Sequence, residues 1–119
     1  MSTHPIIEKS AVGSGRKTAL RYALVTPARN EAAYIERTIQ STLAQTVHPV
    51  KWVIVSDGST DGTDEIVKSY AVQCSWIELE RMPEGAERHF AAKVNAFNAG
   101  YARLKGVQYD LVGNMDADI

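Results

Sequence analysis

Short apolar runs alternate with amphipathic stretches along this chain, and the alternation predicts strands and helices in turn. Buried strands are expected over 22–26 and 51–56. The second contains the apolar and mostly β-branched run at 52–55, which is typical of a strand buried on both faces of a sheet. Apolar and polar side chains alternate over 76–80, which indicates a half-buried strand near a sheet edge. A fourth strand is expected over 109–115, and the first strand is expected to end at Pro27.

Apolar residues recur at helical spacing between these strands. Ile35, Ile39 and Leu43 follow one another every fourth residue, so a helix is expected over 31–45, with Asn30 as its N-terminal cap. A second helix is expected to begin near Thr63, after the turn and capping residue types at 60–62.

A third helix is expected from residue 86 to about residue 104. Its larger apolar residues step by three and four, so they are expected to form the face that packs on the core. They are Phe90, Val94, Phe97, Tyr101 and Leu104.

The regular alternation predicts an α/β fold, an open and mostly parallel sheet with right-handed crossovers and helices on both faces. Residues 1–20 carry Pro5, several glycines and scattered charges without a period, so we expect a flexible lead-in there. The ordered domain is then expected over 21–119.

Composition narrows the class of protein. The 119 residues allow one small domain or part of a larger one, and 45% hydrophobic residues suffice for a core. A net charge of −1 without a basic stripe argues against a nucleic-acid partner. The single Cys74 excludes an internal disulfide, and no apolar run of about 18 residues is present. We therefore expect a cytoplasmic protein, which regions beyond residue 119 could hold at the cytoplasmic face of a membrane.

Asp57 is the first candidate for ligand contact. It directly follows the strand at 51–56, and open parallel sheets bind their ligands at the carboxyl ends of strands. The alternative is that the Asp57 carboxylate caps the turn by accepting backbone amides.

Two further candidates lie near the end of the chain. Asp116 and Asp118 follow the fourth expected strand one residue apart, and paired carboxylates suit a hard cation such as Mg²⁺ or Mn²⁺. A solvated turn is the alternative for this pair. Lys93 lies among small residues and could reach a phosphate, although a solvated helix lysine is the ordinary interpretation.

Four motifs occur in order: TPARNE at 26–31, VSDGSTDGT at 55–63, KVNAFN at 93–98 followed by Gly100, and DAD at 116–118. In this combination the chain resembles the family 2 glycosyltransferases of GT-A fold, over about residues 22–119. Ser56 departs from the Asp often found at that position. The resemblance implies a Rossmann-like nucleotide-binding half with strand order 3-2-1-4.

The resemblance also implies roles for individual residues. A nucleotide would contact residues from all four motifs, and Mn²⁺ or Mg²⁺ would bind Asp118 together with Asp116. No catalytic residue is expected in this chain, because the family's general base lies downstream of its Asp-x-Asp motif. The expected nucleotide-binding residues are Pro27, Ala28, Glu31, Asp57, Ser59, Lys93 and Asp116.

The function implied is inverting transfer of a sugar from a nucleotide-sugar donor, a UDP-sugar, to an acceptor hydroxyl in polysaccharide or glycoconjugate biosynthesis. The chain is expected to be the N-terminal, donor- and metal-binding part of such an enzyme. Its strand at 109–115 would then be an open edge through which two copies could associate.

Two alternatives stay open. A sugar-nucleotide pyrophosphorylase would be expected to have a Gly-rich loop after the first strand, and residues 28–31 contain no glycine. A non-catalytic nucleotide-sugar-binding module would be distinguished by the lack of a downstream carboxylate motif.

Overall fold

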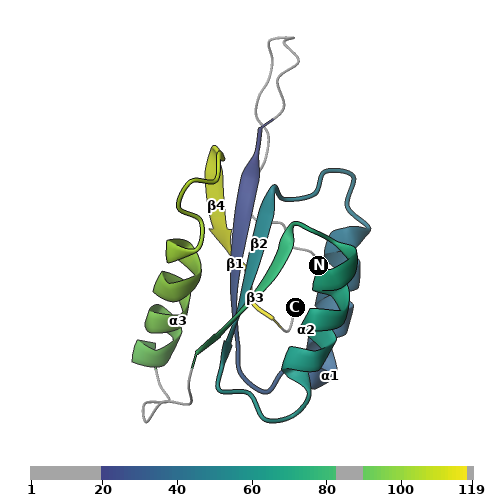
Figure 1. Ribbon diagram of the computed structural model, residues 1–119, viewed down its shortest axis with the longest axis vertical. Helices are drawn as coiled ribbons and strands as arrows, with labels where there is room; N and C mark the ends of the chain where they lie inside the picture. The colour runs from purple at the N-terminus through teal and green to yellow at the C-terminus, as the bar shows by residue number, and fades with distance from the viewer. Residues whose placement is uncertain (1–19, 83–89, 118–119) are drawn as a thin grey trace.

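The protein is a four-stranded parallel sheet covered by helices on both faces (Figure 1). The computed structural model describes residues 20–82 and 90–117. The sheet order is β3-β2-β1-β4, as expected. Its strands are β1 (Tyr22–Ala28), β2 (Lys51–Asp57), β3 (Ile77–Met82) and β4 (Leu111–Asn114).

Three helices connect these strands. Helices α1 (Ala32–Leu43) and α2 (Thr63–Gln73) lie together on one face, and α3 (Phe90–Ala102) lies on the other (Figure 1). Each strand–helix–strand unit therefore follows the expected α/β pattern. None of the helices within the described ranges is long and apolar enough to span a membrane. The lead-in expected over 1–20 lies outside the described residues, apart from Leu20.

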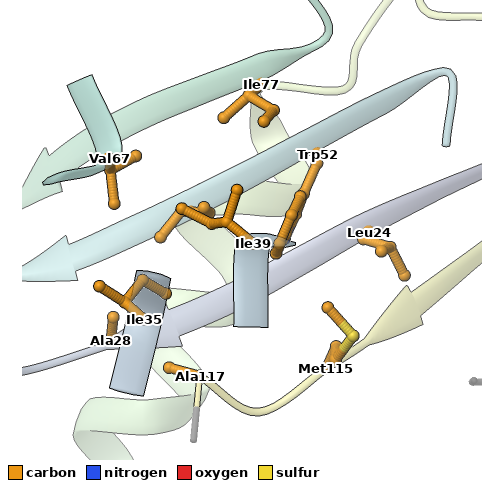
Figure 2. Packing of buried hydrophobic residues seen from close by; sticks show 10 residues of the cluster. Leu24, Ala28, Ile35, Ile39, Trp52, Val67, Ile77, Met115 and Ala117 are labelled. Carbon is orange, nitrogen blue, oxygen red and sulfur yellow. The ribbon is translucent and has the colours of Figure 1, made fainter. Parts of the chain in front are cut away.

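The two central strands are buried on both faces, as their apolar runs predicted. Leu24 and Trp52 belong to the core beneath α1 and α2, whereas Val25 and Val53 belong to the core beneath α3. Figure 2 shows the first core, where Ile35 and Ile39 of α1 point toward the sheet. Successive side chains of a strand point to opposite faces of the sheet, so this alternation determines which strand residues contact each helix layer.

The expectation that the first strand ends at Pro27 was wrong, because β1 continues to Ala28. The amide of Met115 donates to the carbonyl of Val25 at 3.0 Å, so the next donor that β1 would offer to the β4 side is the amide that Pro27 lacks. The missing donor therefore ends the β1–β4 ladder. It leaves the β1–β2 pairing intact, and Pro27 pairs there with Val55.

The core face expected for α3 was partly wrong. Leu104 is buried and Phe97 is half-buried, but Val94 and Tyr101 are 39% and 49% exposed. The small residues of the helix face the sheet instead, with Ala96 only 1% exposed and Gly100 also buried. A Cβ on Gly100 would lie 2.5 Å from Cγ1 of Val25, so the helix lies closer to the sheet than a larger side chain would allow. The side chain of Phe90 lies outside the described residues.

Candidate functional site

The C-terminal end of the sheet, where all four parallel strands finish, brings the candidate residues of three strands together. Strand β2 ends at Asp57, β1 ends beside it at Ala28, and β4 leads into Asp116 on the other side of β1. Strands two places apart in a sheet are separated by roughly 10 Å. The helices begin at this same end of the sheet (Figure 1).

The loop that follows β1 is fixed to the loop that follows β2 through Asn30. The residue adopts a left-handed conformation with φ 54°, which asparagine tolerates better than most residues. Its amide donates to Oγ of Ser59 at 3.0 Å, and its Oδ1 accepts the amide of Thr60 at 2.8 Å. The prediction that Asn30 caps α1 was therefore wrong, because its side chain reaches the neighbouring loop and the N-cap position is Glu31.

A second set of contacts in these loops caps two helices at once. Asp61 accepts the amide of Ala32 at 3.1 Å through Oδ2, and the amide and hydroxyl of Thr63 at 3.1 and 2.6 Å through Oδ1. The Thr63 hydroxyl also accepts the amide of Glu31 at 2.9 Å. Hydrogen bonding from the Thr63 hydroxyl is the main cause that lowers the pKa of Asp61 below its ordinary 3.8. Within the segment at 60–62, where turn and capping residue types were noted, Asp61 therefore caps the N-termini of both α1 and α2.

Two arginines hold the backbone of the β2 loop, and sequence reasoning assigned a role to neither. Arg29 donates from Nη1 to the carbonyl of Asp57 at 2.8 Å. Arg81 donates to the carbonyl of Ser59 at 3.1 Å and to Oδ2 of Asp64 at 2.6 Å. Their contacts are long-range and mostly to backbone carbonyls, for which a single sequence carries no spacing signal. The guanidinium groups place positive charge at the C-terminal end of the sheet.

The acidic residues of this region fall into two groups. Asp61 and Asp64 are engaged in the hydrogen bonds just described, although Oδ1 of Asp64 is buried without a partner. Within residues 20–82 and 90–117, no hydrogen bond or ion pair engages the side-chain carboxylate of Asp57 or of Asp116. The alternative in which Asp57 caps its turn is therefore not what the structure has. Both carboxylates are available to a ligand.

The other residues expected to bind nucleotide differ in where their side chains lie and in what they contact. Pro27 and Ala28 lie at the end of β1 between the two available carboxylates. The Ser59 hydroxyl, expected to face the ligand, accepts the amide of Asn30. Lys93 lies in the first turn of α3, and its side chain is outside the described residues.

The expected metal site rests on Asp116 and Asp118. Asp116 is exposed two residues after the end of β4, and Asp118 lies outside the described residues. No group of three or more acidic, histidine or cysteine side chains that could hold a metal ion occurs among the described residues. The carboxylate oxygen of Asp116 fits a hard cation, whose remaining ligands would have to come from Asp118, from water and from the phosphates of a nucleotide.

Comparison with known proteins gives one family and one fold. The sequence model described as Glycosyl transferase family 2 matches residues 23–119. An uncharacterized glycosyltransferase of Nostoc sp. is 32% identical over 102 residues, which cover 83% of this chain and 28% of that protein. A mannosyltransferase of Pyrobaculum calidifontis, solved in complex with GDP-Man and Mn²⁺, is similar with a TM-score of 0.61 and 28% identity. TarS of S. aureus, solved in complex with UDP, is similar in fold with a TM-score of 0.64 and 22% identity.

The similarity covers most of this chain but a minor part of each of these proteins. It extends over 85% of the chain for the mannosyltransferase and 83% for TarS. The chain spans about 28% of the length of each of the three. Within the matched part, the strand order found here agrees with the GT-A arrangement implied by the sequence motifs.

Proposed function

The chain belongs to glycosyl transferase family 2, and from this premise we propose that it binds the nucleotide-sugar donor of an inverting glycosyl transfer at the C-terminal end of its sheet. The observation that carries the proposal is the pair of available carboxylates, Asp57 and Asp116, on either side of the end of β1. A carboxylate that bonds to no other protein group can bind a ligand without first giving up a hydrogen bond or an ion pair.

Each part of the donor has a group suited to it. Pro27, at the end of β1, offers an apolar surface for a nucleoside, with the backbone of Ala28 and with Glu31 beside it; the Ala28 side chain itself is buried in the core. Asp57 offers hydrogen-bond acceptors for the N–H or O–H groups of a base or ribose. Ser59 lies in the same loop. It is proposed to contribute to this part of the site by joining the loops after β1 and β2 through its hydrogen bond with the Asn30 amide.

The diphosphate needs positive charge. Lys93 lies in the first turn of α3, where backbone amides and the helix dipole favour an anion. Asp116 and Asp118 are proposed to hold Mn²⁺ or Mg²⁺ against the diphosphate. When bound, the cation would neutralise the charge that develops on the leaving diphosphate during transfer.

The donor nucleotide is proposed to be a UDP-sugar. The solved structures with similar folds contain different nucleotides, GDP-Man with Mn²⁺ in one and UDP in the other. A binding experiment therefore has to compare both bases. The acceptor is proposed to be a hydroxyl group of a growing polysaccharide or glycoconjugate.

The proposal is tested by calorimetric titration of the 119-residue chain with UDP and with GDP, in Mn²⁺, in Mg²⁺ and in EDTA. We expect tighter binding of UDP than of GDP and a loss of affinity in EDTA, because the phosphates complete the coordination of the metal. Asp116→Asn should reproduce the effect of EDTA. Asp110→Asn serves as a control, because Asp110 precedes β4 and pairs with Arg21 at the opposite end of the sheet.

The outcomes separate the parts of the proposal. Absence of nucleotide binding under all conditions would overturn the donor role. Affinity that EDTA does not change would overturn the metal role while leaving the donor role standing. Tighter binding of GDP would replace the proposed base.

A further inference from the structure

The peptide unit after Ala117 is tied to helix α1 by a buried hydrogen bond. Oγ1 of Thr38 donates to the carbonyl oxygen of Ala117 at 2.6 Å, across 79 residues of sequence. Thr38 is fully buried, and the Ala117 side chain is 3% exposed. Figure 2 shows Ala117 in the core beside Ala28 and Ile35, so this segment is held by its side chain as well as by its carbonyl.

The bond from Thr38 to Ala117 lies just beyond the last hydrogen bond that joins β4 to the sheet. The last bond between β4 and β1 runs from the amide of Met115 to the carbonyl of Val25, because Pro27 offers no further amide. The chain then passes through Asp116 without a ladder partner. The hydroxyl of Thr38 supplies the next fixed point, at the carbonyl of the peptide unit that joins Ala117 to Asp118.

The alternative is an ordinary helix threonine that bonds to its own helix. Thr42, one turn further along α1, does this, and its hydroxyl donates to the Thr38 carbonyl at 3.1 Å. The Thr38 hydroxyl leaves the helix instead. A valine would fill the same space in the core without a polar group that needs a partner, so the hydroxyl is informative.

We infer that Thr38 is a positioning residue, which fixes the Ala117 carbonyl directly after Asp116 and so sets the direction of the Asp116 carboxylate toward a metal-bound diphosphate. The inference rests on the proposed function. With Met115 and Ala117 buried and Asp116 exposed between them, holding the Ala117 carbonyl limits how the segment can rotate. Groups that orient metal ligands from behind change metal affinity by about 10- to 100-fold when they are removed.

The test compares Thr38→Val with Thr42→Val in the 119-residue chain. Both remove a buried threonine hydroxyl from the same helix at nearly constant volume, but only the first releases Ala117. The readouts are the ratio of UDP affinity in Mn²⁺ to that in EDTA, and the hydrogen-exchange rate of the Met115 amide, whose bond to the Val25 carbonyl is the last one before the segment that Thr38 holds.

We expect Thr38→Val to lower the affinity ratio by about tenfold and to speed exchange at that amide. Thr42→Val should leave both at the parent value, and Thr38→Ser should restore both because it keeps the hydroxyl. If Thr38→Val fails to fold, Thr38→Ala and Thr42→Ala carry the same comparison.

Equal values for the two valine variants, or no recovery in Thr38→Ser, would overturn the inference. Its failure can be told from failure of the proposed function, because the latter appears as missing Mn²⁺-dependent binding in the parent chain. In that event the exchange rates still decide whether Thr38 holds the segment, and unchanged exchange in Thr38→Val overturns the inference by itself.

Discussion

The carboxylate of Asp61 and the backbone amide of Ala32 are 29 residues apart in the chain and 3.1 Å apart in the fold. The same carboxylate accepts the amide of Thr63, so one side chain provides a hydrogen-bond acceptor for a free backbone amide in the first turn of both α1 and α2. The two helices are thereby fixed relative to each other at the end of the sheet that carries the candidate site.

Replacing Asp61 should therefore cost stability. Asp61→Ala removes caps from two helices, and each cap is worth about 1 kcal/mol, so we expect the free energy of unfolding to fall by about 1–2 kcal/mol. Urea denaturation followed by circular dichroism measures it. Asp57→Ala is the matched control, since it removes the same charge from the same loop without removing a side-chain hydrogen bond. An equal loss in both variants would contradict the capping role.

The Asp61 contribution should also depend on pH. Because its pKa is lowered in the folded protein, mainly by the Thr63 hydroxyl, the carboxylate stabilises the fold fully above its ordinary pKa of 3.8. That stabilisation is lost as the pH falls from there through the lower folded value. The difference in unfolding free energy between the parent and Asp61→Ala should therefore narrow between pH 6 and pH 3. A difference that widens on acidification would show the opposite shift.

Asp57 should matter for binding where Asp61 matters for folding. Asp57→Ala removes a charged hydrogen-bond partner worth about 1.5–3 kcal/mol, so UDP affinity should fall by roughly tenfold to more than a hundredfold. Calorimetry with UDP and Mn²⁺ measures the change, and Asp110→Ala controls for the loss of one negative charge. A folded Asp57→Ala variant that binds UDP like the parent would rule out contact between this carboxylate and the nucleotide.

The contact between α3 and the sheet predicts a cost for a single added methyl group. In Gly100→Ala the new Cβ would lie 2.5 Å from Cγ1 of Val25 and 2.8 Å from Cγ2 of Val55, and both side chains belong to the core. Overpacking of about 1–3 kcal/mol should outweigh the gain in helix propensity of up to about 1 kcal/mol. Thermal denaturation should show a lower midpoint for Gly100→Ala. Asn98→Ala, at an exposed position of the same helix, should show no loss.

The fold could be predicted from the sequence because its signals are local. Apolar runs mark the strands, fourfold spacing marks α1, and their alternation gives the parallel sheet with helices on both faces. The position of Asp57 and Asp116 at strand ends followed from the same pattern, because parallel strands end on one side of a sheet.

What the sequence did not reveal depends on distances between elements. Whether Pro27 ends its strand depends on which neighbour its missing amide faces. The spacing of apolar residues predicted that the larger side chains of α3 face the sheet. The helix lies so close to the sheet that Gly100 faces it instead. The roles of Asn30 and Arg81 rest on contacts with groups far away in the chain.

The two edges of the sheet differ in how they are protected, and the difference predicts self-association through β4. The other edge strand, β3, carries Glu78 and Glu80, with Glu78 paired to Lys51 of β2. The residues of β4, LVGN, include no charge and no proline.

The register of β4 shows which of its groups are open. The amides of Leu111 and Met115 donate to carbonyls of β1 or the residue before it, at 3.2 and 3.0 Å. By the period of two, the backbone groups of Val112 and Asn114 face away from the sheet, where a second copy could pair with them.

Asn114→Pro should abolish this association. It removes one outward amide and leaves the donors that face β1, which is the placement that an edge strand tolerates for proline. Asn114→Ala keeps the amide and is the matched control. Sedimentation velocity over a range of concentrations should show association of the parent and of Asn114→Ala, and a monomer for a folded Asn114→Pro. A parent chain that stays monomeric at high concentration would contradict the prediction. Dissociation of Asn114→Ala would instead assign the contact to the side chain, because the outward amide is then still present.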